Sequence, residues 1–326
     1  MNRLLTSSVL LSLVAILIVA VSSRPLIYAF ETNLGFVLLS KTINSQTQHN
    51  LLADAETWFQ RSETMSDSMP VEAYQGLGLV AFHAGDDENA SAHFRKAGLS
   101  AADMLAYGHT AAALNQPEDA QRWYKLTTQQ FPNMGDAWYY LGLMYQEQGL
   151  LSQAQSAYAA GVSAPDRIEI GSSDLYFGLA DMARLQNNYA YAQHLYEQAL
   201  QSDSFSFQYA KVNTLDQLAA IYIRQQKYQK AIPLLEQAID RSPSFDWPYF
   251  RLGTAYYLCC QDTERAISYL NQGIETSPDN PWGYVLLGDI YLAEGDRELA
   301  RTLFRKSLEL RPNWTVAEER LLAMDQ

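Results

Sequence analysis

The sequence has very few of the residues that build metal centres and disulfide frameworks. It contains 2 cysteines and 5 histidines in 326 residues, and the cysteines, Cys259 and Cys260, are neighbours. Adjacent cysteines close only a small, strained ring, so we expect no structural disulfide. No zinc-ligand or redox spacing is present around them. We therefore expect neither a metal nor a cofactor.

Basic residues are also scarce relative to acidic ones. Lysine and arginine number 23 against 36 aspartates and glutamates, which gives a net charge of −13. Phosphate binding needs a basic stripe, so this balance argues against nucleic acid as a partner. It also argues against binding to anionic lipids through a cluster of basic residues. The acidic surface is typical of a protein that is kept soluble by its charge.

The sequence motifs of common catalytic sites are missing. We find no glycine-rich phosphate loop, HExxH, GxSxG or CxxC in the chain. We therefore expect a protein that is not an enzyme and that has no small-molecule substrate.

The most apolar segment lies at the N-terminus. Residues 4–21 carry no charge, and 12 of these 18 residues are Leu, Ile or Val. On an insertion scale they contribute about −4 to −7 kcal/mol before Ser and Thr are counted, and a helix of that length spans about 27 Å. Two interpretations stay open. Residues 1–25 form a signal-anchor helix, which we favour, or they form a signal peptide that is cleaved near Ser22.

The rest of the chain repeats a pattern of small, aromatic and alanine residues. The clearest copy contains Tyr284, Leu287, Gly288, Tyr291, Gly295, Ala300, Phe304, Ser307 and Pro312. A second contains Trp138, Leu141, Gly142, Tyr145, Gly149, Ala154, Tyr158 and Gly161, and a third contains Leu218, Ala219, Tyr222, Ala231, Leu235, Ala238 and Pro243. These residues resemble the tetratricopeptide-repeat (TPR) family, whose 34-residue unit reads W-x2-L-G-x2-Y, then A-x3-F, then P.

Four weaker copies complete the series, at residues 71–100, 101–134, 173–206 and 246–280. Each copy is two amphipathic stretches separated by a short polar turn. The resemblance implies an all-α fold, an α-solenoid (a right-handed superhelix) of about seven TPR helix pairs over residues 71–314. We expect residues 315–326 to form a capping helix and residues 26–70 to form a helical spacer or a degenerate repeat. Residues 207–211 read as a small insertion.

The resemblance also implies a binding groove along the first helices of the units. In the family, the second, fifth, ninth, twelfth and thirteenth positions of a unit usually project into it. They correspond here to Asp136, Tyr139 and Leu143, to Phe177, Asp181 and Arg184, to Asp216 and Arg224, to Trp247, Phe250, Thr254 and Tyr257, and to Trp282, Val285 and Asp289. Such a groove of rings and carboxylates suits an apolar segment that carries basic residues. The alternative is that some of these rings pack against the neighbouring unit.

One specialised function of the family is not supported. TPR domains that grip the carboxyl terminus of chaperones use lysine and asparagine at the fifth and ninth positions of their first unit, where this chain has Gln75 and Leu79.

We therefore expect a non-catalytic scaffold or assembly factor that binds other proteins or peptide segments and is tethered to a membrane by its N-terminal helix. Arg3 favours a cytoplasmic N-terminus, which places the repeats in the periplasm or cell exterior, or the protein is secreted after signal cleavage. Two other functions stay open. One is an accessory subunit of an envelope enzyme complex, for glycan transfer or cytochrome maturation, and the other is a self-associating structural protein.

Overall fold

The computed structural model describes residues 48–64 and 71–325, which form 16 α-helices and no β-strand. The expectation of an all-α fold is confirmed. The apolar run at residues 4–21 lies outside the described residues. Within the described ranges, no helix combines the length and the hydropathy that a membrane crossing requires.

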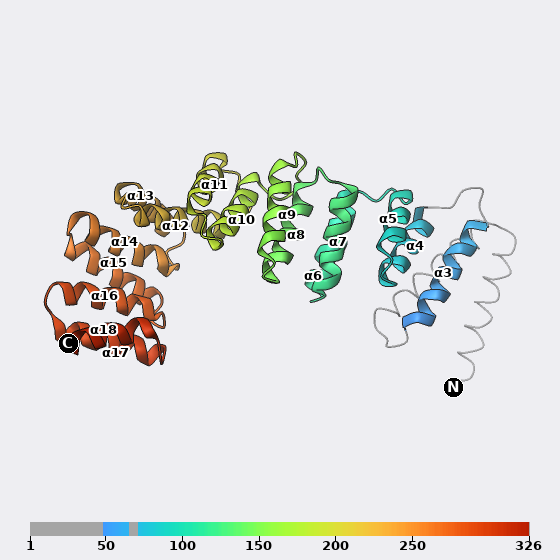
Figure 1. Ribbon diagram of the computed structural model, residues 1–326. Coiled ribbons are helices and arrows are strands. Elements are labelled where there is room, and N and C mark those ends of the chain that lie inside the picture. The colour runs from blue at the N-terminus through green and yellow to red at the C-terminus, as the bar shows by residue number, and fades with distance from the viewer. Residues whose placement is uncertain (1–47, 65–70, 326) are drawn as a thin grey trace, which may run out of the picture. The chain divides into compact units, whose positions relative to one another are not determined.

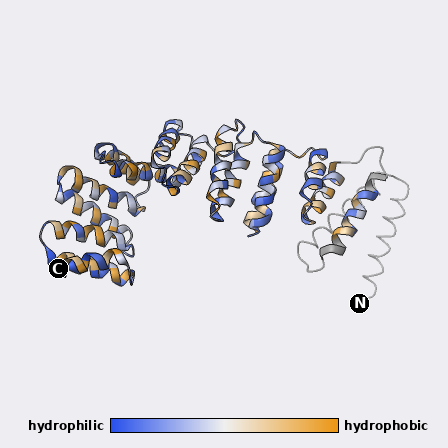
Figure 2. Cartoon of the chain, viewed as in Figure 1, coloured by the Kyte–Doolittle hydropathy of each residue, from blue (hydrophilic) through white to orange (hydrophobic). Residues whose placement is uncertain are grey.

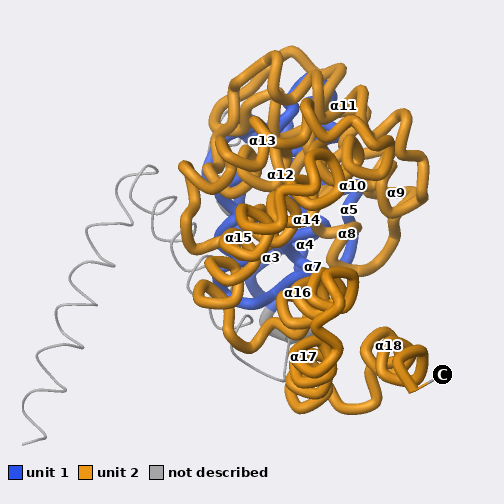
Figure 3. Tube along the Cα trace, turned by 90° about the vertical axis from the view of Figure 1, so that its left-hand side faces the viewer, with its two compact units in different colours: residues 1–137 blue, residues 138–326 orange. Residues whose placement is uncertain are grey.

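The chain divides into two compact units, residues 1–137 and residues 138–326 (Figure 3). Helices of the first unit are α3 (Gln48–Thr64), α4 (Val71–His83), α5 (Asp87–Lys96), α6 (Ala101–Ala113) and α7 (Pro117–Gln130). Helix α8 (Gly135–Glu147) begins at the end of the first unit and lies mostly in the second.

The second unit continues the same alternation of helices to the C-terminus (Figure 1). Its remaining helices are α9 (Leu151–Ser163), α10 (Ser172–Leu185), α11 (Tyr189–Ser202), α12 (Gln208–Arg224), α13 (Tyr228–Arg241), α14 (Asp246–Cys260), α15 (Thr263–Thr276), α16 (Pro281–Ala293), α17 (Arg297–Leu310) and α18 (Thr315–Asp325). Of residues 207–211, which read as an insertion, Phe207 is the N-cap of α12 and the other four form its first turn.

Helices α4 to α17 form seven successive pairs, and α18 packs on α17 as the capping helix. The helical solenoid of about seven pairs is therefore confirmed. We call the helices of each pair its first and second helix. Apolar and polar residues are mixed along all of them, as expected for helices that bury one side only (Figure 2).

The turn inside each pair is built in the same way all along the described repeats. One residue of every turn has a positive φ, and these residues are Gly85, Asn115, Gly149, Asn187, Gln226, Gln261 and Gly295. A left-handed residue directly after a helix reverses the chain and lets the second helix start within a few residues. In three pairs, an aspartate then caps the second helix by accepting a backbone N–H, as Asp296 does from Leu299 at 3.1 Å.

Glycines of the first helices lie against aromatic rings of the second helices. A Cβ added to Gly142 would lie 2.7 Å from the Tyr158 ring, and one added to Gly288 would lie 2.6 Å from the Phe304 ring. Both rings are fully buried. The repeated Gly and aromatic residues of the sequence are therefore the points at which the paired helices approach most closely.

The expectation that the two cysteines stay unbonded is wrong. Cys259 and Cys260 form a disulfide, and the described residues contain no free cysteine. The pair occupies the last two positions of α14, directly before the left-handed Gln261. At a helix end no following helical turn constrains the backbone, so the chain accommodates a ring that the helix interior would resist.

Candidate functional site

The first helices of the second unit form a continuous face. Helices α10, α12, α14 and α16 each contact the next one in this series. We call this the first-helix face. It is where the sequence predicts the partner-binding residues of the last four repeats.

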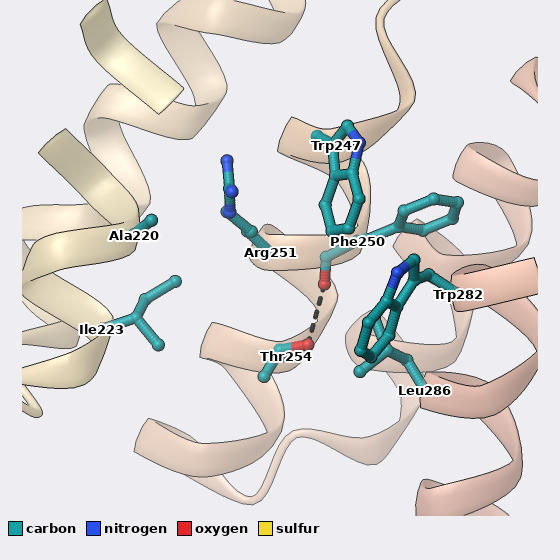
Figure 4. A pocket seen from close by; sticks show the side chains of 8 residues that line it. All are labelled: Ala220, Ile223, Trp247, Phe250, Arg251, Thr254, Trp282 and Leu286. Carbon is teal, nitrogen blue, oxygen red and sulfur yellow. Dashed lines mark hydrogen bonds between the residues drawn. The ribbon is translucent and has the colours of Figure 1, made fainter. Parts of the chain in front are cut away.

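A pocket of about 230 Å³ opens on this face, between α12, α14 and α16 (Figure 4). Its walls are mostly aliphatic and aromatic. The lining residues are Ala220 and Ile223 of α12, Trp247, Phe250, Arg251 and Thr254 of α14, and Trp282 and Leu286 of α16. Arg251 is the one charged residue among them.

The aromatic side of the pocket is held rigidly by packing. Phe250 is fully buried, and its ring fits against two glycines, Gly273 and Gly283, where an added Cβ would lie 2.5 and 2.7 Å from it. The Trp247 ring lies edge-on to Phe250 at 6.1 Å between centroids and 6.2 Å from the ring of Trp282. These contacts fix the rings in place before any ligand arrives, which lowers the entropy cost of binding.

An ion pair joins the pocket to the neighbouring first helix. Arg251 donates from Nη1 to Oδ2 of Asp216, and its guanidinium carbon lies 5.2 Å from the centroid of the Trp247 ring. The Asp216 side chain is only 1% exposed. Burial raises the pKa of the Asp216 carboxyl, while the Arg251 guanidinium acts in the opposite direction. Asp216 therefore links α12 to α14 and orients Arg251.

The fifteen residues predicted for the groove differ widely in exposure. Five are buried, namely Asp136, Tyr139, Asp216, Phe250 and Val285. Nine are half-buried, namely Leu143, Phe177, Asp181, Arg184, Trp247, Thr254, Tyr257, Trp282 and Asp289, and Arg224 is exposed. The pocket brings together four of the fifteen, Trp247, Phe250, Thr254 and Trp282.

Carboxylates on the first-helix face already have partners within the chain. Asp181 accepts from Arg184 at 2.8 Å, and Asp289 accepts from Arg320 of α18 at 2.7 Å. The third, Asp216, is paired with Arg251 as described above. A basic residue of a ligand would have to compete with the chain's own arginines at all three sites.

Four lining residues were missed by the sequence argument. Ala220 and Ile223 occupy the ninth and twelfth repeat positions, so the same rule selects them, although they carry no polar group. Arg251 and Leu286 lie at the sixth position, which the rule leaves out. The sixth position reaches the groove because the fifth turns toward the adjacent unit, as the burial of Phe250, Asp216 and Val285 shows.

Comparison with known proteins identifies the repeats. Family models described as tetratricopeptide repeat match residues 105–168, 214–246 and 260–323. A comparison with curated proteins gave no significant sequence match.

Solved structures show the same fold. The chain is similar to a chain of the APC/C hetero-tetramer Cut9–Hcn1, with 20% identity, a TM-score of 0.55, and coverage of 84% of this chain and 53% of the other, about half its length. It is also similar to PilF of Pseudomonas aeruginosa, with 14% identity, a TM-score of 0.55, and coverage of 68% and 97%. The similarity to YrrB, a TPR protein with an unusual peptide-binding site, is weaker, with 15% identity, a TM-score of 0.49, and coverage of 60% and 96%.

Proposed function

We propose that this chain, which carries tetratricopeptide repeats, is a non-catalytic scaffold that binds a segment of a partner protein on its first-helix face. The observation that carries the proposal is the preformed pocket between α12, α14 and α16. Aromatic residues in desolvated pockets are the typical anchors of protein interfaces.

The size and lining of the pocket favour a peptide side chain over a metabolite. At about 230 Å³ it is smaller than the roughly 300–1,000 Å³ typical of small-molecule sites. It offers rings and aliphatic groups, with a single charged residue, Arg251, at one side. One bulky apolar side chain of an extended segment fits this environment.

The proposal includes a membrane tether. The apolar run at residues 4–21 supports it, because its length and composition match a bilayer-spanning helix. In this proposal the repeats face the periplasm or cell exterior. A reporter fused after Gln326 that is active only in the cytoplasm should stay inactive, and an active reporter would contradict the orientation.

Filling the pocket tests the binding site without removing any core residue. We expect Ala220→Phe to occupy the space between Ile223 and Trp282 and to abolish partner capture by the full-length protein. Crosslinking in membranes followed by mass spectrometry measures the capture. Alanine at Tyr139 or Phe250 is a poor substitute, because both side chains are buried and their loss costs about 3–5 kcal/mol of stability.

The matched control is Ala190→Phe on the second helix α11, where the alanine is exposed. This variant adds the same ring and should keep the captured proteins. If both variants capture the same set, binding lies elsewhere on the chain. If the wild-type protein captures only copies of itself, the self-associating structural function replaces the scaffold.

A further inference from the structure

The charge at the rim of the pocket has the opposite sign to that of the whole chain. The net charge of the protein is −13, yet the single charged residue lining the pocket is Arg251. Its side chain is 22% exposed. Beyond the pocket, the exposed Arg224 follows directly after the lining residue Ile223 on α12.

The guanidinium of Arg251 has N–H donors that make no hydrogen bond within the described residues. Only Nη1 is used within the described residues, where it donates to Oδ2 and to the backbone oxygen of Asp216. Nε and Nη2 therefore remain available, and these two N–H groups match the two oxygens of a carboxylate. The guanidinium carbon lies 5.2 Å from the centroid of the Trp247 ring, which stands beside it in the pocket (Figure 4).

Asp216 holds Arg251 in place but is not itself a contact for a ligand. Its carboxylate is buried on α12, and a partner's cation cannot reach it without displacing Arg251. The nearby Asp246 is 8% exposed and accepts a hydrogen bond from Asn280 at 2.6 Å. Around the pocket, the acidic residues of the first-helix face therefore serve the chain's own structure.

We propose that the pocket recognises an acidic segment: a bulky apolar side chain enters between Trp247, Trp282 and Ile223, and an adjacent aspartate or glutamate of the partner binds Nε and Nη2 of Arg251. This inference rests on the proposed function and fixes the chemistry of the partner. The carboxylate in this proposal belongs to a side chain, and a peptide that carries a free terminal carboxylate instead tests the alternative. The chain's other acidic groups weaken this attraction little, since the Debye length at physiological salt is about 8 Å.

Matched peptides test the proposal directly. We would use acetylated and amidated fluorescent peptides of Gly, Ser and Ala with a central Asp-Trp-Asp, Asn-Trp-Asn or Lys-Trp-Lys, and measure binding to the full-length protein by anisotropy. We expect the Asp peptide to bind about tenfold or more tightly than the Asn peptide, from the value of a charged hydrogen bond, and the Lys peptide to bind most weakly. A fourth peptide that ends in a free carboxylate after Trp should bind no better than the Asn peptide.

Variants of the protein link the preference to Arg251. Arg251→Gln should bring the affinity for the Asp peptide down to that for the Asn peptide. Arg251→Gln together with Asp216→Asn should do the same without leaving a buried carboxylate unpaired. The control is Arg301→Gln, whose guanidinium pairs with Asp325 near the C-terminus and should not affect binding.

Failure of this inference and failure of the proposed function give different results. Equal affinity for all peptides, with loss of binding in Ala220→Phe, would refute the acidic partner and keep the binding site. A preference for the Lys peptide, or for the peptide with a free carboxylate, would also overturn the inference. If no peptide binds at 1 mM, both proposals fail.

Discussion

Asp174 is a buried acid whose protonation state affects the stability of the second unit. It lies at the start of α10, is not exposed, and accepts a hydrogen bond from the backbone N–H of Ser206 at 2.7 Å. Burial raises the pKa of its carboxyl above the ordinary value of 3.8, against the hydrogen bonds that act the other way. The Tyr139 hydroxyl nearby stays neutral in this range, because burial raises its pKa as well.

The sign of the pH dependence follows from this shift. Because the folded protein binds this proton more tightly than the unfolded chain, the stability that Asp174 contributes is fully present below pH 3.8 and is lost as the pH rises through the folded pKa. We expect Asp174→Asn, which keeps an acceptor for Ser206, to gain stability relative to wild type between pH 4 and pH 7. Urea unfolding at both pH values measures the difference, and a difference that is independent of pH would contradict the assignment.

Two helices approach closely at Gly288, so adding a single methyl group there should lower the stability of the protein. Gly288→Ala places a Cβ 2.6 Å from the Phe304 ring, so we expect overpacking of about 1–3 kcal/mol to exceed the gain of about 1 kcal/mol in helix propensity. Adding Phe304→Leu removes the ring that is hit, and the fifth repeat already combines Ala219 with Leu235 in one core cluster. The double variant should therefore lose less stability than the sum of the single variants, and strict additivity in a double-mutant cycle would exclude this contact.

Among the helical elements, the turn between α12 and α13 is built from an unfavourable residue. Gln226 is exposed and has a φ of 59°, a position that glycine fills in other repeats. The left-handed backbone costs a non-glycine residue about 1–2 kcal/mol, and glycine avoids this cost. Glycine also loses more conformational entropy on folding, which offsets about 0.5–1 kcal/mol of the gain. We expect Gln226→Gly to raise the unfolding free energy by about 0.5–1 kcal/mol in thermal or chemical denaturation.

The preceding residue is the control for this turn. Gln225 has a φ of −86°, which any residue adopts, so Gln225→Gly should lower stability by about 0.5–1 kcal/mol. Opposite signs at two adjacent glutamines would attribute the effect to backbone conformation. The same sign at both would attribute it to the side chains.

The helices and their pairing were predictable from the sequence because the signals are local. Apolar spacing, the glycine or asparagine of the turn and the small residue opposite an aromatic lie within one repeat, so each copy specifies its own helix pair. The disulfide between Cys259 and Cys260 was not predictable in this way. The general strain of adjacent cysteines argues against it, and only the position of the pair at the end of α14 allows it.

The candidate site depends on contacts between repeats, and the sequence of one repeat does not contain them. From its repeat position, Phe250 is predicted to face the groove. Its ring instead packs against Gly273 and Gly283 of other helices and is buried. From its repeat position, Asp216 is predicted to contact a ligand. In the structure it is paired instead with Arg251 of the next repeat. Ala220 has no functional group that would mark it as a binding residue. It contributes to the pocket because its small side chain leaves space beside Trp247 and Trp282.

At the scale of the whole molecule, a repeat array needs its last apolar face covered. Helix α18 does this for the second unit. Trp314, Ala317 and Met324 are buried in the cluster that contains Phe304, and Arg320 pairs with Asp289 of α16. Since each repeat contacts only its neighbours, stability lost at the end should spread inward step by step.

Removal of residues 313–326 tests this one-dimensional behaviour. Losing Trp314 and Met324 should destabilise the α16–α17 pair by about 3–6 kcal/mol, from about 1.5–3 kcal/mol for each large buried side chain. Hydrogen exchange should accelerate strongly in α16 and α17, less in α14 and α15, and little in α10 and α11. Leu322→Ala is the control, because Leu322 is 63% exposed and its loss should change nothing. Equal acceleration in all helices of the second unit would show instead that it unfolds as a single cooperative block.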